Sequence, residues 1–491
     1  MTAIQRSIMF SAFERYANLL LFVGATAVLS RLLTPAEFGA YAVVSALTTV
    51  LSAAFQEFGG ANYLIQKREL SHDDIRSAFT VTLLISIAVG AGIYLLAGPI
   101  AGFFKQESMR LGMVATAPNF LLAPFSGTLL ALYRKRLDFR TPMFCGLVSA
   151  VVTSVASIVL AILKFSYMAP IWGALVGNVA LLISLLAMQR DMSIFRPSLA
   201  AYRSVVGFGL YSSGISLINV FYGLAPQLFL ARILDFASVG LYSRAVNTTQ
   251  MFDKLVMQVL NPVIMPAFAA RRTAGEDLKE VYFSSAQLLA AVQWPAMVFI
   301  ALMAQPIISI WLGANWLEIV PLVRILCIGN IFLFAACLSY PTLVAAGSVR
   351  DALRSSLISL PPSLLIILGA SFFGVEAVAA STLLTLPFQA AVAFYFIGRQ
   401  LRLSIADFGR ALGKSVIVAL STAAGVAVCA LLVEYDAIGP AAGLFFAVLA
   451  AGSCWLLALL ATSHPLLPHL FHAAHGVAAV PPRIWRWRSA Q

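Results

Sequence analysis

The sequence has little charge. Only 11% of its 491 residues are Asp, Glu, Lys or Arg, while 61% are hydrophobic. A soluble domain carries about 25% charged residues, so this composition excludes an ordinary soluble protein and is typical of a polytopic helical membrane protein. Runs of about 20 mostly apolar residues, the length that crosses a bilayer as a helix, recur along the whole chain. They leave no segment long enough for a soluble domain.

Residues that bind metals or carry catalysis are also scarce. The five cysteines lie in apolar segments without paired spacing, which favours small hydrophobic residues over disulfides or metal ligands. Four of the five histidines lie after residue 463 with no carboxylate or thiol beside them, so we predict no metal site and no cofactor. Paired carboxylates and a Gly-rich phosphate loop are missing from the loops, so we predict that the protein is not an enzyme.

The apolar runs predict about fourteen transmembrane helices. The first lacks a small-residue cleavage site after a short apolar core, so we expect it to be retained. The predicted spans are 7–30, 39–62, 78–100, 111–133, 142–163, 168–188, 204–226, 238–265, 281–303, 319–345, 353–373, 376–397, 412–433 and 438–461.

The basic residues alternate between the two sets of connecting loops. One set, together with both termini, carries 23 of the 32 basic residues, whereas the opposite loops carry five and the spans four. Because short cytoplasmic loops attract Lys and Arg, this bias predicts that both termini are cytoplasmic. The net charge of +12 therefore reflects topology, and we expect no nucleic-acid partner. The final Trp- and Arg-rich residues predict contact with anionic membrane lipid.

An internal repeat divides the predicted helices. The stretch "RLLTPAEFGAY" at 31–41 matches "RILDFASVGLY" at 232–242 at a constant offset of 201, through Arg, Leu, Gly and Tyr. Each stretch joins the first two spans of a six-span block, so the two blocks enter the membrane from the same side and the repeats are parallel. Chance similarity between apolar sequences is the alternative. We predict two six-helix lobes around a central cavity, at 1–200 and 201–400, two additional transmembrane helices at 401–463, and a cytoplasmic tail at 464–491.

A polar stripe runs along one face of the eighth predicted span. Its members are spaced by three or four residues, which keeps them on one helical face: Arg244, Asn247, Met251, Lys254, Gln258 and Asn261. Asp253 lies on nearly the opposite side. Because a charge at the bilayer centre costs at least ~2.5 kcal/mol, we expect this face to meet protein or a water-filled cavity.

Three other helices carry polar faces, at spans 1, 2 and 7. Glu14 and Arg15 lie in span 1 and Glu57 ends the polar face of span 2, at similar predicted depth. Spans 1, 2, 7 and 8 are therefore expected to line one cavity. Glu14 and Glu57 could bind a coupling proton or Na⁺, and Asp253 is a third candidate. The alternative is structural: a buried ion pair of Arg15 with Glu14 or Glu57 would also account for charged residues at these positions.

A basic stripe with no acid within one turn on its face, set in a polar cavity, predicts an anionic substrate. Phosphate is the natural group, since Arg and Lys bind it through charge-assisted hydrogen bonds. The predicted substrate-binding residues are Arg15, Arg244, Asn247, Lys254, Gln258 and Arg324. Arg324 lies near the outer end of span 10, where its side chain could reach the membrane interface instead.

Several stretches resemble a known family. They are "RLLTPAEFGAYAVVSAL", "FGGANYLIQKRELSHDDIRSAFT", "ALYRKRLDFR" and "VGFGLYSSGISLINVFY", and they are similar to the bacterial polysaccharide transporter (oligosaccharide flippase) family of the multidrug/oligosaccharidyl-lipid/polysaccharide exporter superfamily. The resemblance implies two six-helix lobes with two additional C-terminal helices in the bacterial inner membrane. It also implies that a polyprenyl-diphosphate-linked oligosaccharide is moved from the cytoplasmic to the periplasmic leaflet.

The resemblance further implies a cavity lined by basic residues, and Arg15, Arg244 and Lys254 fit that pattern. A polysaccharide polymerase and export machinery are the partners expected beside the lipid-linked substrate. Two readings within the same superfamily remain open, a murein-precursor flippase and a multidrug exporter. The basic character of the mid-membrane charges disfavours a cavity for cationic drugs. A membrane polymerase or ligase is disfavoured because the outer loops are short and poor in charge.

Overall fold

The computed structural model describes the chain at residues 3–58, 60–67, 69–136, 138–189, 191–252, 254, 268, 271–272, 275 and 277–475. These residues form helices joined by short turns, and none of them lies in a β-strand, which confirms the predicted all-α fold. The chain divides into two compact units. Unit 1 comprises Met1–Val259, Trp311–Leu322 and Leu360–Thr382, and unit 2 comprises Leu260–Ile310, Val323–Ser359 and Leu383–Gln491.

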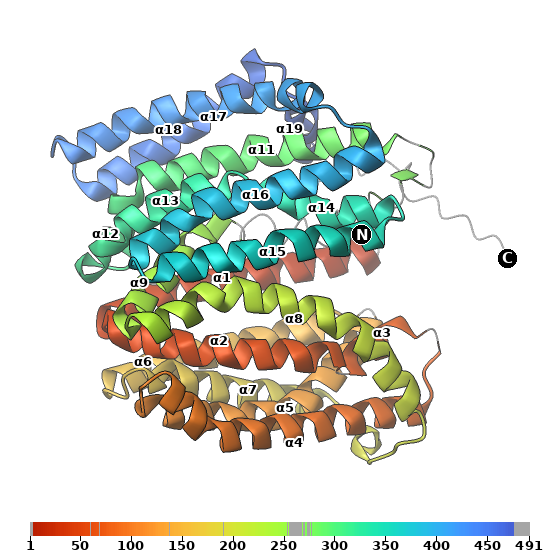
Figure 1. Ribbon diagram of the computed structural model, residues 1–491. Helices are drawn as coiled ribbons and strands as arrows, with labels where there is room; N and C mark the ends of the chain where they lie inside the picture. The colour runs from red at the N-terminus through yellow and green to blue at the C-terminus, as the bar shows by residue number, and fades with distance from the viewer. Residues whose placement is uncertain are drawn as a thin grey trace. The chain divides into compact units, whose positions relative to one another are not determined.

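Unit 1 is a bundle of long helices that run side by side (Figure 1). Its helices are α1 (Ala3–Leu32), α2 (Pro35–Phe58), α3 (Gly60–Gln66), α4 (His72–Phe103), α5 (Ser108–Lys135), α6 (Arg140–Ile162), α7 (Met168–Met188), η1 (Ser193–Phe195), α8 (Tyr202–Ile233), α9 (Phe236–Thr249) and η3 (Ala314–Ile319). The helix α2 packs against both α8 and α9, while α1 packs against α6. These contacts set the walls of the candidate site.

Unit 2 contains most of the remaining helices, α11 (Leu278–Leu302), α12 (Ala304–Trp311), α13 (Val320–Asn330), α14 (Leu333–Ala345), α17 (Ile405–Glu434), α18 (Pro440–Ala461) and α19 (Leu466–His475). The helices α15 (Val349–Ser371) and α16 (Val375–Leu401) each contribute residues to both units, and the last residue of α12 and the first three of α13 belong to unit 1. Within unit 2, α11 packs against α17 and α17 packs against α18. These two units are defined by contacts between residues, whereas the predicted lobes at 1–200 and 201–400 are defined by the sequence repeat. The two lobes therefore stay a prediction.

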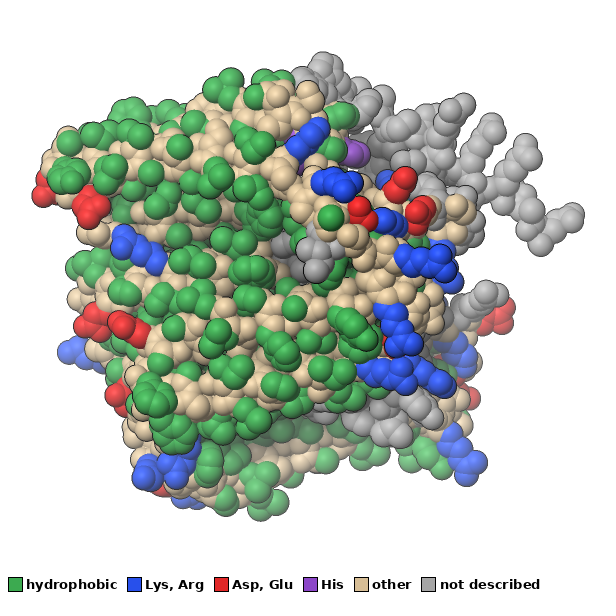
Figure 2. All heavy atoms as spheres, turned by 45° about the horizontal axis from the view of Figure 1, so that its top comes forward, with side chains coloured by type: hydrophobic (Ala, Val, Ile, Leu, Met, Phe, Trp, Pro, Cys, Tyr) green, Lys and Arg blue, Asp and Glu red, His purple; other side chains and the backbone are tan. Residues whose placement is uncertain are grey.

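Among the described residues, nine helices are long and apolar enough to cross a membrane. The protein is therefore a multi-pass membrane protein, and the count of fourteen spans stays a prediction. Hydrophobic side chains cover the flanks of the helices in Figure 2, while charged side chains gather near the helix ends. A surface of this kind suits a lipid environment, where apolar side chains need not be buried against protein.

One predicted span is interrupted. Residues 319–345 form two helices, α13 and α14, which meet at Ile331 and Phe332. Carbonyl groups released by a break inside a bilayer need hydrogen-bond partners, and α11 supplies them. Gln293 Nε2 donates to the Asn330 carbonyl at 3.0 Å and Trp294 Nε1 donates to the Ile331 carbonyl at 2.9 Å. The apolar run could not reveal the break because these donors come from another helix.

The two repeated stretches begin their second helices with matched caps. At the start of α2, the Glu37 backbone N–H donates to Thr34 Oγ1 at 3.3 Å, and the Thr34 N–H donates to Glu37 Oε2 at 2.8 Å. At the start of α9, the Ser238 N–H donates to Asp235 Oδ1 at 2.7 Å. Such caps satisfy the free N–H groups of the first helical turn. Thr34 and Asp235 stand 201 residues apart, which is the offset of the repeat.

Candidate functional site

A polar cavity of about 640 Å³ lies within unit 1. It is lined by α1, α2, α6, α7, α8 and α9. Spans 1, 2, 7 and 8 of the sequence correspond to α1, α2, α8 and α9, and these four helices line one cavity as predicted. That the cavity is the central one between two six-helix lobes stays a prediction. The helices α6 and α7 were not predicted to take part.

Hydroxyl and amide side chains cover much of the cavity wall. They are Asn18, Thr26, Ser45, Thr49, Ser149, Thr153, Ser154, Ser157, Gln227, Ser243, Asn247 and Gln250. Some hydroxyls are held by backbone carbonyls, as where Ser149 Oγ donates to the Gly177 carbonyl at 2.8 Å. Asn18 Oδ1 is buried and accepts no hydrogen bond within the described part of the chain. The wall therefore offers polar groups that a polar or sugar-containing ligand could use.

Arg244 is the single charged residue among the described residues of the wall. Its side chain is only 7% exposed, and its Cζ lies 3.5 Å from the ring centroid of Phe38 and 5.8 Å from that of Trp316. The guanidinium plane can stack on aromatic faces, which stabilises a buried cation without a carboxylate. No described acid forms an ion pair with Arg244, and its Nε lacks a hydrogen-bond partner there.

The two aromatic rings that hold Arg244 are themselves fixed. Phe38 and Trp316 meet edge to face with ring centroids 5.5 Å apart. Trp316 is fully buried, and its Nε1 donates to the Ser30 carbonyl at 2.7 Å. The guanidinium of Arg244 is thus oriented by packing and keeps hydrogen-bonding capacity for a ligand. Such pre-organisation lowers the cost of binding an anion.

Lys254 lies further along the same stripe. Its Nζ is 3.9 Å from the ring centroid of Phe22, and Phe22 lines the cavity. Asn247, between the two cations, lines the cavity as well. The structure therefore brings Arg244 and Asn247 into one cavity and places Lys254 against its wall. The predicted stripe residue Gln258 and the ion-coupling candidate Asp253 lie outside the described residues.

The remaining predicted site residues do not line this cavity within the described part of the chain. Glu14 is half-buried near Gly146, where an added Cβ would lie 2.8 Å from Glu14 Oε1. Arg15 is exposed and has an interaction partner of its own. The side chain of Glu57 lies outside the described residues, so the predicted charged layer stays a prediction. Arg324 is exposed on α13 in unit 2 and is not part of this cavity wall.

Sequence reasoning missed the residues of α6 and the aromatic rings. Ser149, Thr153 and Ser157 are spaced by four residues, so their spacing could have shown a polar helical face. Phe22, Phe38 and Trp316 gave no such signal, because aromatic residues are common throughout this chain. Their role follows from the contacts with cations, which only the fold reveals.

Known proteins that are similar to this chain are named for polysaccharide biosynthesis. Residues 28–321 match a family described as polysaccharide biosynthesis protein. The lipopolysaccharide biosynthesis protein WzxC of Escherichia coli (strain K12) is 24% identical over 305 residues, 61% of this chain and 61% of that protein. The succinoglycan biosynthesis transport protein ExoT of Rhizobium meliloti (strain 1021) is 25% identical over 328 residues, 65% of each chain. The chain thus spans less than two thirds of the length of these relatives.

Solved structures with the same fold extend over most of the chain. The lipid II flippase MurJ in an inward closed conformation superposes with a TM-score of 0.71 at 12% identity, covering 95% of this chain and 99% of MurJ. An inward-facing multidrug resistance MATE family transporter of the MOP superfamily gives a TM-score of 0.65 at 13% identity, covering 80% and 98%. At these identities the likeness concerns the fold alone. The family match covers more than half of the chain, and this chain therefore belongs to the polysaccharide biosynthesis protein family.

Proposed function

We propose that this protein is a flippase for a polyprenyl-diphosphate-linked oligosaccharide. It moves the lipid-linked sugar from the cytoplasmic to the periplasmic leaflet of a bacterial inner membrane by alternating access, for the synthesis of a surface polysaccharide. Family membership and the names of the relatives WzxC and ExoT support this role. A polysaccharide polymerase that consumes the translocated unit is the partner that such a role requires.

One observation carries the proposal. Arg244 stands in a polar cavity inside a membrane bundle, and its charge is stacked on aromatic rings with no described acid paired to it. A diphosphate leaving water would lose hydration worth many kcal/mol, and a fixed cation in a polar cavity offsets part of that loss. The hydroxyl and amide groups of the wall suit the attached sugars. Transport of a cationic drug would place like charges together in this cavity.

Arg15, Asn247, Lys254, Gln258 and Arg324 complete the proposed set of substrate contacts. Asn247 and Lys254 have the strongest support, since they belong to the stripe that includes Arg244. Glu14, Glu57 and Asp253 are proposed to bind the coupling H⁺ or Na⁺. A carboxylate half-buried in a membrane helix, as Glu14 is, is a suitable proton or cation site.

Complementation of a deletion strain tests the proposal. Arg244→Ala, Arg244→Lys and the exposed control Arg110→Ala are produced at matched protein level. We expect Arg244→Ala to abolish surface polysaccharide and to leave lipid-linked oligosaccharide in the inner leaflet. Arg244→Lys keeps the charge but loses planar stacking, so partial activity is expected. Full complementation by Arg244→Ala would remove the cavity from the transport path, and restored lipid II transport in a MurJ-depleted strain would favour the murein-precursor alternative.

A further inference from the structure

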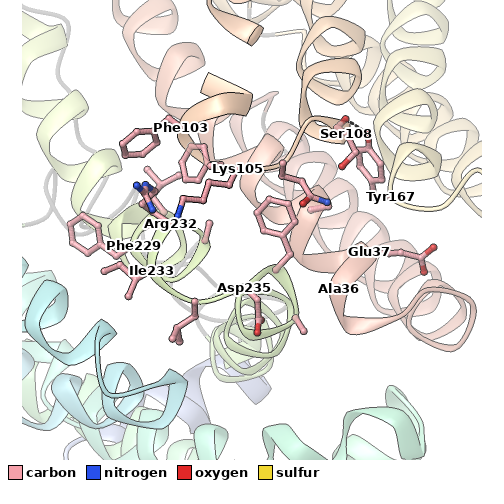
Figure 3. A pocket seen from close by; sticks show the side chains of 18 of the residues that line it. Ala36, Glu37, Phe103, Lys105, Ser108, Tyr167, Phe229, Arg232, Ile233 and Asp235 are labelled. Atoms are coloured by element: carbon pink, nitrogen blue, oxygen red, sulfur yellow. Dashed lines mark hydrogen bonds between the residues drawn. The ribbon is translucent and has the colours of Figure 1, made fainter. Parts of the chain in front are cut away.

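A second and larger pocket opens in unit 1, at the helix ends opposite the N-terminal end of α1. It measures about 1420 Å³ and is lined by the start of α2, the end of α4 and the turn after it, the turn between α6 and α7, the ends of α8 and α9 that meet at Asp235, and Leu368 and Phe372 at the end of α15 (Figure 3). The polar cavity around Arg244 shares none of its lining residues. The proposed contacts of the transported substrate therefore leave this pocket unexplained.

Two cations converge in this pocket. Arg232 belongs to the last turn of α8, and Lys105 follows the C-terminal end of α4. Figure 3 shows their side chains pointing toward each other across the pocket. Both are exposed, and neither forms an ion pair with a described acid. Two like charges that approach each other are unfavourable unless an anion lies between them.

The acids of the pocket serve another purpose. Glu37 Oε2 accepts hydrogen bonds from the backbone N–H and the Oγ1 of Thr34, at 2.8 and 3.0 Å. Asp235 Oδ1 accepts the Ser238 N–H at 2.7 Å. Both carboxylates thus cap helix N-termini, where the helix dipole also favours them. Neither of them forms an ion pair with Arg232 or Lys105.

An aromatic wall stands beside the two cations. The Cζ of Arg232 lies 5.1 Å from the ring centroid of Phe103, whose side chain is 58% exposed. Phe221 and Phe229 line the same pocket, and Phe221 is also exposed. Exposed rings next to unpaired cations match a ligand with an apolar chain and an anionic head. A free anion would contact the cations and make no use of the rings.

Helix dipoles offer a simpler account of each cation taken singly. A Lys or Arg near a helix C-terminus is stabilised by ~0.3–1 kcal/mol, and both residues occupy such positions. That account does not require the two helix ends to direct their cations into one pocket. It also does not explain the exposed rings beside them. The combination is therefore better explained by a shared ligand.

We propose that this pocket binds the phosphate head group of a lipid, with Arg232 and Lys105 on the phosphate and the phenylalanine wall on the chain. The assignment rests on the proposed function for its place in the membrane, since the predicted orientation puts these turns at the periplasmic surface. There the pocket receives the phosphate-bearing end of a prenyl lipid after translocation. A site on this surface would hold the lipid carrier outside the central cavity and favour its release from Arg244.

Lipid binding to the purified protein tests this site without any transport assay. Native mass spectrometry compares undecaprenyl phosphate, undecaprenol and inorganic phosphate on the wild type and on Arg232→Gln/Lys105→Asn. The matched control is Arg110→Gln/Lys164→Asn, which removes one cation from the first turn of α5 and one from the turn between α6 and α7, both outside the pocket. Lys105 and Lys164 both have positive φ, 55° and 61°, a conformation that Asn tolerates.

We expect the pocket variant to bind undecaprenyl phosphate about tenfold more weakly or worse, as the loss of charge-assisted hydrogen bonds implies. The control should stay within about twofold of the wild type, a difference of ~0.4 kcal/mol. Equal binding by the pocket variant and the control would overturn the site. Equal binding of undecaprenol, or of inorganic phosphate alone, would overturn its assignment to a lipid phosphate. Loss of transport in Arg244→Ala would leave each of these outcomes unchanged.

Discussion

Gly39 of α2 and Gly240 of α9 face each other where these two helices of the candidate site's wall meet. A Cβ added to Gly39 would lie 1.6 Å from the Phe236 carbonyl oxygen, and one added to Gly240 would lie 2.0 Å from the Pro35 carbonyl oxygen. Each glycine therefore meets the carbonyl four residues before the other. The two glycines occupy matched positions of the internal repeat, so the contact is symmetric with respect to the repeat.

Replacing either glycine should push α2 and α9 apart. Gly39→Ala or Gly240→Ala is expected to lower the free energy of unfolding by ~1–3 kcal/mol, as overpacking does. Thermal unfolding in detergent measures the loss. Gly92→Ala and Gly98→Ala are suitable controls because a Cβ at either position of α4 meets no heavy atom within 4 Å. Similar melting temperatures for all four variants would show that the helices can separate at little cost.

The sequence revealed the repeat but not this contact. The matching of Gly39 with Gly240 was visible as a pattern, and it indicated two related turns. It could not indicate that the two turns touch, since that depends on how α2 packs against α9. In the same way, the spacing of Arg244, Asn247 and Lys254 predicted a polar face. The contacts of Phe38 with Arg244 and of Phe22 with Lys254 depend on tertiary packing, which the spacing does not show. The spacing of residues thus predicts which face of a helix is polar, but not which side chains of other helices contact that face.

Lys254 should matter for transport more than for folding. Its Nζ lies 3.9 Å from the Phe22 ring centroid, so Lys254→Ala removes a cation next to the cavity while the aromatic wall stays in place. We expect normal protein levels but no restored surface polysaccharide, partial activity for Lys254→Arg, and a milder loss for Asn247→Ala. Complementation at matched protein level gives the comparison. Aqueous thiol labelling of Lys254→Cys reports access, and full complementation by Lys254→Ala without labelling would assign the stripe to packing.

The distribution of basic residues predicts the orientation of the protein in the membrane. Reporter fusions after Arg203 and Arg399 should give cytoplasmic signals, and a fusion after Glu318 should give a periplasmic one. The eighth predicted span is the critical element, since it is polar and its loss would invert the helices that follow it. A cytoplasmic signal after Glu318 would invert every helix that follows α9. It would also move the α11 to α14 region to the other side of the membrane.

Ion coupling can be separated from structural pairing at Glu57 and Arg15. If Glu57 binds the coupling ion, Glu57→Gln should be produced normally and lose transport driven by an H⁺ or Na⁺ gradient. If Arg15 instead forms a structural ion pair with Glu14 or Glu57, Arg15→Ala should reduce the amount of folded protein, because an acid is left unpaired. Transport into inverted vesicles with an imposed gradient, together with detergent-resistant protein yield, measures both. Gradient-driven transport by Glu57→Gln at the wild-type rate would remove its coupling role.

His464 joins the end of α18 to α19, and we expect it to make the stability of unit 2 depend on pH. The imidazole is buried, with Nδ1 accepting the Leu466 N–H at 3.1 Å and Nε2 3.1 Å from Ser415 Oγ. This arrangement fits the neutral ring that carries its proton on Nε2. Burial, and then the charge of nearby Lys414, lowers the pKa of His464 below its usual 6.5. The unfolded chain therefore binds a proton more readily than the folded protein does.

The sign of the resulting pH dependence follows directly. The stabilising contribution of His464 is complete above pH ~6.5, the value for an unfolded histidine. It is lost as the pH falls from there through the lowered pKa of the folded protein, because protonation of the unfolded chain favours unfolding. We expect the melting temperature to fall between about pH 7 and pH 5, and to fall less in His464→Gln, which cannot protonate. Since Gln can still accept the Leu466 N–H, a matching slope in the variant and the wild type would assign the acid sensitivity to other groups.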